Sequence, residues 1–119
     1  MPIKDVTELE VYQLALKLLK VTYRLAKVVA KEDLECAKQL KKTASQIAPL
    51  IAEGYGKKSS PSEFKRFQVM AMGTSDEMIT HIRQAKIICL SVNKKSCDIL
   101  EEQYLILSKR LNVLIKNWK

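Results

Sequence analysis

The chain has 119 residues, of which 47% are apolar and 29% charged, so it is long enough for one domain, residues 1–119, with a single hydrophobic core. Three glycines and three prolines leave few turns, which disfavours a sheet protein, and no apolar run of about 18 residues exists that would span a membrane. The net charge of +8 favours an anionic partner, and the polar, acidic start of the chain does not resemble a secretory signal, so we expect a cytoplasmic protein.

The first predicted helix covers about residues 7–29, and Thr7 with Glu10 three residues later predicts a capping box at its start. Its apolar arc spans roughly 260° of the helical projection. The arc consists of one column of Leu9, Tyr12, Leu16, Leu19, Tyr23 and Ala26, a second of Val11, Ala15, Leu18, Thr22, Leu25 and Val29, and a flank of Leu14, Val21 and Val28. A helix on the outside of a monomeric bundle needs a much narrower stripe, so this helix predicts a subunit interface and hence a homo-oligomer.

The remaining face of the same helix is basic. It carries Lys17, Lys20, Arg24, Lys27 and Lys31, and no acidic residue lies between positions 13 and 31. Like charges at this spacing cost a helix a few tenths of a kcal/mol per pair, so a face that served stability alone would interleave Glu. Two interpretations stay open, a row that binds the phosphates of RNA or DNA and a plain solvated face.

The second predicted helix covers about residues 33–54. Pro49 inside it predicts a change of direction between Ser45 and Pro49, and Gly54 and Gly56 are expected to end it. A second basic group consists of Lys38, Lys41 and Lys42 on one side of this helix and of Lys57, Lys58, Lys65 and Arg66 around the turn that follows. In an antiparallel bundle this turn lies beside the end of the fourth helix, which carries Lys109, Arg110, Lys116 and Lys119. Helix C-termini favour cations in any case, so part of this cluster is ordinary helix electrostatics.

The third predicted helix has the clearest start, with Ser60 as N-cap, Pro61 at the first position and Glu63 at the third, and it runs to about Val92. Its seam is Phe64, Ala71, Met78, Ala85 and Val92, with a companion row of Phe67, Thr74, His81 and Ile88. The fourth helix begins near Ser96 and packs through Leu100, Tyr104, Leu107, Leu111, Leu114 and Trp118, while Ile99, Ile106 and Val113 lie off that seam. Short connections make neighbouring helices antiparallel, so the sequence predicts an all-α, up-down four-helix bundle.

Catalytic and metal-binding patterns are absent from the sequence. His81 is the single histidine, and it follows Glu77 by four residues, whereas a di-iron bundle needs Glu-x-x-His on two helices. We expect His81 to be a buried, hydrogen-bonded core residue, and no other base is present for a catalytic triad. We therefore expect no catalytic residue, no metal, no cofactor and no enzymatic activity.

The three cysteines, Cys36, Cys89 and Cys97, have no metal-ligand spacing and are expected to be reduced thiols, two of them packed in the core. The aromatic residues are few and fall in core positions, so the sequence does not predict a platform on which unpaired bases stack.

Several segments spread over nearly the whole chain together resemble a known family. They are Leu9-Glu10-Val11-Tyr12-Gln13 with Ala15, Gln39-Leu40-Lys41-Lys42 with Ala44, Ile51-Ala52-Glu53-Gly54-Tyr55-Gly56-Lys57, and Phe67 followed by Met70-Ala71, Gly73-Thr74 and Glu77. In these segments the chain resembles the bacterial four-helix-bundle proteins encoded in intervening sequences of 23S ribosomal RNA genes, a family that includes accessory variability proteins of diversity-generating retroelements. The chain departs from the family at Pro49, which stands one place later than usual, and at Leu50, where an Asn is usual.

The resemblance implies a homo-oligomer in the form of a pentameric ring that binds nucleic acid through basic surfaces, and its retroelement members act as partners of a reverse transcriptase. Three functions stay open at this point. The chain is a nucleic-acid-binding oligomer, an accessory protein that binds a reverse transcriptase and its template RNA, or a purely structural oligomer.

Overall fold

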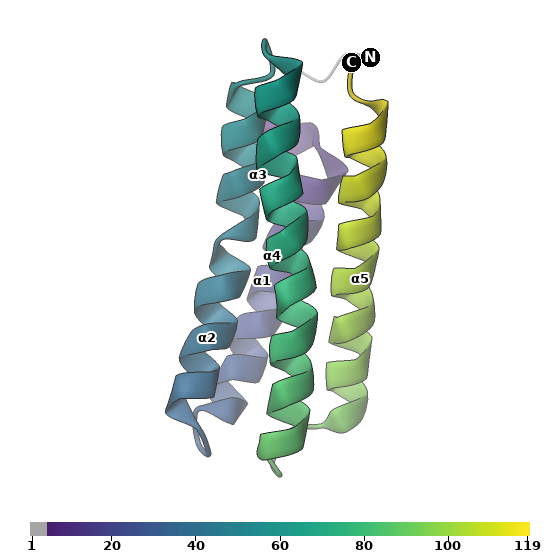
Figure 1. Cartoon of the computed structure of the whole chain (residues 1–119). Coiled ribbons are helices and arrows are strands. Elements are labelled where there is room, and N and C mark those ends of the chain that lie inside the picture. The colour runs from purple at the N-terminus through teal and green to yellow at the C-terminus, as the bar shows by residue number, and fades with distance from the viewer. Residues whose placement is uncertain (1–4) are drawn as a thin grey trace.

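The structure of the chain is a computed structural model that describes residues 5–119, and every element in this range is helical. A short 3-10 turn, η1 (Val6–Glu8), precedes α1 (Glu10–Val29), α2 (Leu34–Ser45), α3 (Ile47–Gly56), α4 (Pro61–Ile88) and α5 (Lys94–Asn117). Because α3 continues α2 along one side of the molecule, the arrangement is the predicted antiparallel four-helix bundle (Figure 1). Residues 1–4 lie outside the described residues. They belong to the start of the chain, for which the sequence predicts no secretory signal.

The bundle is an elongated rod of 47 × 21 × 20 Å. Within residues 5–119, none of the helices has both the length and the apolar character that crossing a bilayer requires.

The start of α1 differs from the predicted capping box. Thr7 belongs to the 3-10 turn, whose own cap is Asp5, and α1 begins three residues later at Glu10. Leu9, between the two elements, has extended backbone and a side chain that is buried in the core, so the chain turns inward there before the helix starts. The Gln13 side chain donates a hydrogen bond of 2.8 Å to the Thr7 carbonyl and ties the turn to the helix.

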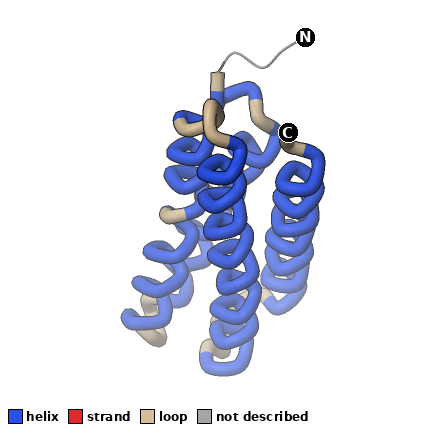
Figure 2. Tube along the Cα trace, turned by 45° about the horizontal axis from the view of Figure 1, so that its top comes forward, coloured by secondary structure: helices blue, strands red, loops and turns tan. Residues whose placement is uncertain are grey.

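The predicted change of direction in the second helix is confirmed. Proline has no N–H to donate, and its ring crowds the carbonyl four residues earlier, which for Pro49 is that of Ser45. Accordingly α2 ends at Ser45, and the Gln46 amide turns back to the Thr43 carbonyl, three residues earlier, at 3.2 Å. The helix resumes as α3 at Ile47, and the interruption is visible as a short loop between the two helices (Figure 2).

The prediction that Gly54 ends the second helix is wrong, whereas Gly56 is indeed the last residue of α3. Gly54 is buried inside α3 and faces α4. A Cβ atom at this position would lie 2.6 Å from Nε2 of Gln68 and 2.8 Å from Cβ of Phe67. Glycine therefore serves close helix packing here and not helix termination.

The predicted N-cap of α4 is confirmed, because the Ser60 hydroxyl accepts a hydrogen bond from the Glu63 amide at 3.4 Å with Pro61 as the first helical residue. Glu63 does not complete the predicted capping box, since the Ser60 amide donates to the Lys57 carbonyl at 3.0 Å and the Glu63 carboxylate pairs with Arg66. The seam from Phe64 to Val92 is buried throughout. The predicted companion row, Phe67, Thr74, His81 and Ile88, does not stay in the core along its length, because Ile88 at its end is 50% exposed. A column of Gln68, Ser75 and Ile82 is buried instead.

Both predicted boundaries at the connection between α4 and α5 shift by a few residues. Helix α4 ends at Ile88 and not near Val92, because Cys89 adopts extended backbone. Helix α5 begins at Lys94, and its cap is Asn93, whose side chain accepts a hydrogen bond from the Ser96 amide at 2.9 Å.

Candidate nucleic-acid interface

The α1 basic row, which we define as Lys17, Lys20, Arg24, Lys27 and Lys31, is exposed along its whole length. No ion pair within residues 5–119 involves any of these five side chains. The row borders two neighbouring helices, because Lys27 lines a groove between α1 and α2 whereas Arg24 lines a groove between α1 and α5. It therefore forms a charged ridge between two hollows of the bundle surface.

The first hollow, the α1–α2 groove, has a volume of about 390 Å³. It is lined by Tyr23, Ala26, Lys27 and Ala30 of the α1 side and by Leu34, Ala37, Lys38 and Lys41 of α2. Small side chains form its floor, since Ala26 and Ala37 are buried where the two helices pack. Its rim carries three lysines, and no acidic residue lines it.

The α1–α2 groove joins two basic groups that lie apart in the sequence. Lys41 of α2 reaches across to α1, with its Nζ atom 5.6 Å from the centre of the Tyr23 ring. Lys38 forms an ion pair of 3.7 Å with Glu35, and because both side chains are exposed this pair contributes little to stability. Lys42 is also exposed but does not line the groove.

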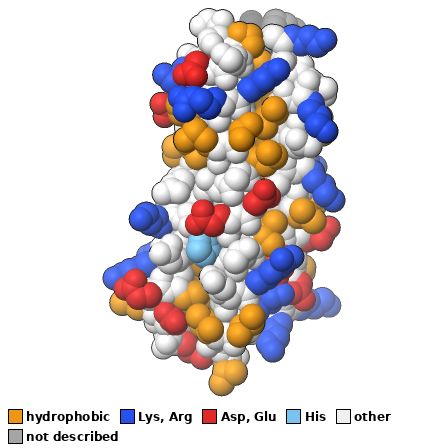
Figure 3. Space-filling view, viewed as in Figure 1, with side chains coloured by type: hydrophobic (Ala, Val, Ile, Leu, Met, Phe, Trp, Pro, Cys, Tyr) orange, Lys and Arg blue, Asp and Glu red, His pale blue; other side chains and the backbone are white. Residues whose placement is uncertain are grey.

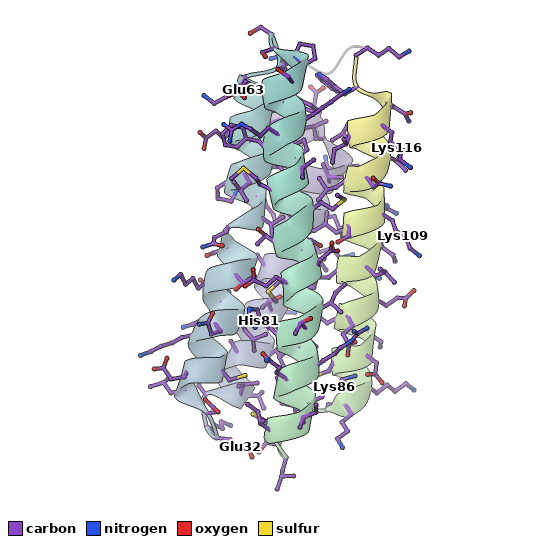
Figure 4. The ribbon with its side chains drawn as sticks, in the orientation of Figure 1. Glu32, Glu63, His81, Lys86, Lys109 and Lys116 are labelled. Atoms are coloured by element: carbon purple, nitrogen blue, oxygen red, sulfur yellow. The ribbon has the colours of Figure 1, made fainter. Side chains whose placement is uncertain are left out.

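Two carboxylates at this end of the bundle, Glu32 and Asp33, bind backbone amides. Asp33 accepts a hydrogen bond from the Cys36 amide at 2.9 Å and so caps α2. Glu32, labelled in Figure 4, accepts hydrogen bonds from the amides of Leu90 at 3.0 Å and Ser91 at 2.6 Å in the α4–α5 loop. Hydrogen bonds from the Ser91 side chain and from these two amides hold the pKa of Glu32 below its usual value.

The other predicted cations, Lys57, Lys58, Lys65 and Arg66, lie around the α3–α4 turn at the opposite end of the rod, near Glu63 in Figure 4. The structure therefore does not bring them together with the α1 basic row. Arg66 is engaged locally, since its Nε atom lies 3.0 Å from Glu63 Oε2 and its guanidinium carbon lies 4.5 Å from the centre of the Phe67 ring. Lys58 lies over Tyr55, 4.2 Å from the ring centre.

The predicted proximity of this turn to the end of α5 is confirmed by the rings of Phe64 and Trp118, which stack with their centres 3.8 Å apart. Of the cations on α5, Arg110 forms an ion pair with Glu10 of α1, and Lys109 lines the groove between these helices. Lys116 and Lys119 are exposed.

A second kind of surface follows the seam between α1 and α5. One hollow of about 680 Å³ lies between the start of α1 and the end of α5, and a smaller one of about 290 Å³ lies where Val21, Leu25 and Val28 approach the start of α5. Ile106 and Val113 line the larger hollow, and Val113 is 56% exposed. The predicted column of Ile99, Ile106 and Val113 thus does lie off the core, and the α1–α5 seam is an apolar, incompletely covered face.

His81 is hydrogen-bonded as predicted. It is not fully buried, because 18% of its side chain is exposed. Its Nε2 atom lies 2.9 Å from Oε2 of Glu77, and its Nδ1 atom lies 3.4 Å from Oε1 of Gln84. Glu77 also accepts a hydrogen bond of 3.4 Å from the Thr43 hydroxyl, so this group links α4 to α2. Figure 3 shows the histidine at the surface beside acidic side chains, on a face where charges of both signs are mixed.

All three cysteines are free thiols, and two of them, Cys89 and Cys97, are buried as predicted. Burial raises the pKa of each thiol, including that of the half-buried Cys36. In the part of the chain that the structure describes, no group of three or more His, Cys, Asp or Glu side chains is placed to hold a metal ion.

Two members of the predicted apolar column of α1, Leu16 and Tyr23, are exposed, and Tyr23 lies beside the α1 basic row. The pattern placed it in the apolar column of the first helix, and the expectation that the aromatic residues lie in the core holds for Tyr55, Phe64 and Tyr104. Tyr23, in contrast, is 47% exposed at the edge of the α1 basic row. The sequence did indicate that Tyr23 borders the basic row, because it lies three residues after Lys20 and four before Lys27, and residues at these spacings are neighbours on a helix surface.

A search among curated proteins and one among solved structures give no significant match. A comparison with models of protein families gives a match over residues 7–113, which is most of the chain. The model is described as 23S rRNA-intervening sequence protein, and it agrees with the resemblance carried by the segments from Leu9 to Glu77. The chain therefore belongs to the family of 23S rRNA-intervening sequence proteins.

Proposed function

We propose that this protein is a non-enzymatic, homo-oligomeric nucleic-acid-binding protein and that the α1 basic row makes its principal phosphate contacts. One observation carries the proposal. Four exposed cations of α1, and Lys31 in the turn after it, follow one another with no acidic residue among them, and two further lysines, Lys38 and Lys41, face Lys27 across the α1–α2 groove. Of the carboxylates near this surface, Glu32 and Asp33 are bound to backbone amides, and Glu35 forms an exposed ion pair of 3.7 Å with Lys38.

The dimensions of the row suit a nucleic-acid backbone. The four cations on α1, from Lys17 to Lys27, span roughly 15 Å at about 1.5 Å of helical rise per residue, and Lys31 extends the row into the turn that follows the helix. Each strand of a duplex carries one phosphate per about 3.4 Å of its helix axis, so each cation has a phosphate within reach. Lysine and arginine contacts to phosphate carry no sequence information, and we expect binding that tolerates any base sequence.

The test replaces Lys20, Arg24 and Lys27 together with Gln, which removes three charges and keeps helix propensity. Fluorescence anisotropy with labelled RNA and DNA, measured between about 50 and about 200 mM salt, gives the affinity and its salt dependence. The slope of log affinity against log salt should become shallower by about 0.7–0.9 for each contact that is lost.

The matched control replaces Lys57, Lys58 and Lys65 with Gln, which removes the same charge from the opposite end of the rod. This control should lose much less affinity than the triple variant of α1. Equal losses in the two variants would mean that net charge alone attracts the nucleic acid, and unchanged affinity in the α1 variant would make the row a solvated face.

The proposed oligomer forms through the α1–α5 seam. The seam leaves Val113 exposed and is lined by apolar side chains from both helices, and Ile99, which is also exposed, lies in the same column of α5 at seven-residue spacing. A stable protein seldom leaves such a face uncovered. The family resemblance adds a pentameric ring as the specific assembly. Several rows on one ring would bind together, and this avidity would turn weak individual contacts into useful affinity.

The proposal that the protein is not an enzyme is supported by its single histidine, whose two ring nitrogens are hydrogen-bonded to Glu77 and Gln84. The three free thiols suit a reducing compartment such as the cytoplasm.

The resemblance also supports an alternative partner, a reverse transcriptase bound together with its template RNA. A reverse-transcriptase gene beside the gene for this chain would favour that alternative. A location inside a ribosomal RNA gene would favour the first proposal, and a protein that binds no nucleic acid even at low salt would be a structural oligomer.

A further inference from the structure

We propose that the α1–α2 groove binds one unpaired nucleotide of a single-stranded nucleic acid, with the base stacked on the Tyr23 ring and the neighbouring phosphates held by Lys27, Lys38 and Lys41. This inference rests on the proposed nucleic-acid-binding function and narrows it to strands with accessible base faces. The groove contributes what the α1 basic row lacks, which is an apolar surface beside the cations.

The shape of the groove suits a flat, apolar group. Its volume of about 390 Å³ falls in the range of small-molecule sites. Three alanines, Ala26, Ala30 and Ala37, keep the space between the helices shallow and apolar. The exposed side chains of Tyr23 and Leu34 add larger apolar surfaces.

The chemistry of the rim suits the anionic part of the same ligand. Lys27 of α1 faces Lys38 and Lys41 of α2, so cations line both sides of the groove. The Lys41 Nζ atom lies over the face of the Tyr23 ring, 5.6 Å from its centre. A base that stacks on this face takes the place of the ammonium group, and the long lysine side chain then reaches the phosphate of the same nucleotide. Among residues 5–119, no acidic side chain lines the groove. The ion pair of Lys38 with Glu35 is exposed and therefore weak, so a phosphate can compete for this lysine.

The Tyr23 ring is the feature that favours single-stranded over double-stranded nucleic acid. Aromatic side chains bind unpaired bases by stacking, and this contact tolerates any base because every base has a flat face. In a duplex these faces are covered by the neighbouring base pairs, so a duplex can engage the lysines but not Tyr23. An acidic peptide would likewise use the lysines and gain little from the ring.

The experiment compares Tyr23→Leu, which removes the ring, with Tyr23→Phe, which retains it. Tyr12→Leu is the matched control, since it makes the same change on α1 outside the groove. Short labelled oligo-U, oligo-dT and a duplex of equal length are titrated by anisotropy, with each strand short enough to occupy one groove. Thermal unfolding and light scattering show that the fold and the assembly are retained.

We expect Tyr23→Leu to weaken binding of oligo-U and oligo-dT by roughly tenfold, the effect of losing one stacked base, and to change duplex binding by less than about twofold. Tyr23→Phe and Tyr12→Leu should keep the affinity of the parent protein for the single strands. A loss confined to oligo-U or to oligo-dT would still support stacking and would show which of these two strands the groove prefers.

The inference would be overturned if Tyr23→Leu weakened the single strands and the duplex equally. It would also be overturned if Tyr23→Leu weakened neither oligo-U nor oligo-dT. If the single strands bind through the α1 basic row and Tyr23→Leu does not weaken them, this inference fails while the proposed function stands. If the parent protein binds none of the three nucleic acids, both fail together.

Discussion

The hydroxyl groups of Thr22 and Tyr104 lie 2.6 Å apart in the interior of the bundle and join α1 to α5. Neither side chain is accessible to solvent. The Tyr104 hydroxyl also lies 3.4 Å from the Leu18 carbonyl, and the Tyr104 carbonyl accepts a hydrogen bond of 3.0 Å from Ser75 of α4. One tyrosine thus connects three helices through polar contacts inside an apolar core.

This contact predicts that Thr22→Val destabilises the protein although it preserves the volume of the side chain. The Tyr104 hydroxyl would keep only its long contact to Leu18, and an incompletely paired buried hydroxyl costs about 1–2 kcal/mol. Urea unfolding measures the change. In the background of Tyr104→Phe, the same Thr22 substitution should cost much less, and an equal cost there would show that the hydrogen bond is not the cause.

The same tyrosine predicts a loss of stability in alkali. Burial raises the pKa of Tyr104 to about 12, although the hydrogen bond with Thr22 acts in the opposite direction. Its pKa in the unfolded chain is about 10. Its contribution to stability is therefore complete below pH 10 and is lost as the pH rises toward 12, by about 2–3 kcal/mol in total. Urea unfolding between about pH 9 and pH 12 should show a steeper decline for the parent protein than for Tyr104→Phe, and parallel curves would contradict this.

A third prediction concerns two of the three glycines, Gly54 and Gly73. Gly54→Ala should destabilise the protein by about 1–3 kcal/mol, because its new methyl group would overlap Gln68 and Phe67 of α4. Gly73→Ala is the control, since it lies inside α4 with no atom within 4 Å of the added Cβ. Alanine should stabilise that position by about 0.5–1 kcal/mol through its higher helix propensity. Thermal unfolding of the two variants should therefore shift in opposite directions.

The bond between Glu32 and the α4–α5 loop predicts a pH response at that end of the bundle. Because the pKa of Glu32 is lowered in the folded state, its contribution to stability is present above about pH 4.5 and is lost as the pH falls through the folded pKa. The amide NMR signals of Leu90 and Ser91 should follow this titration in the parent protein. They should stop doing so in Glu32→Gln, and an unchanged titration there would assign the response to another group.

The α1–α5 seam predicts that Ile99→Lys combined with Val113→Lys dissociates the oligomer, because two charges would have to be buried in an apolar contact. Light scattering should then give a mass near that of the 13.6 kDa chain. Val69→Lys combined with Ile87→Lys adds the same charge at exposed apolar positions of α4 and should leave the assembly intact. A parent protein that is already monomeric at micromolar concentration would refute the proposed oligomer.

Much of the fold follows from local rules that act along the chain. The seam from Phe64 to Val92 reflects helical periodicity, the start of α4 reflects the side chain of Ser60, and the break before Ile47 reflects the missing N–H of Pro49. Each of these depends on residues within about one turn or on a repeating spacing, so the sequence alone predicted them.

The tertiary structure decided the features that depend on a neighbouring helix. The sequence pattern predicted that Gly54 ends a helix, whereas in the structure Gly54 allows α3 to pack closely against Gln68 and Phe67 of α4. The sequence by itself determined that α1 has an apolar arc and a basic line. Which edge of that arc is covered depends on where α2 and α5 pack, so the exposure of Tyr23 beside Lys41 is decided by the packing of α1 against α2. The reason is that helical periodicity specifies the direction of a side chain from its own axis but not what lies opposite.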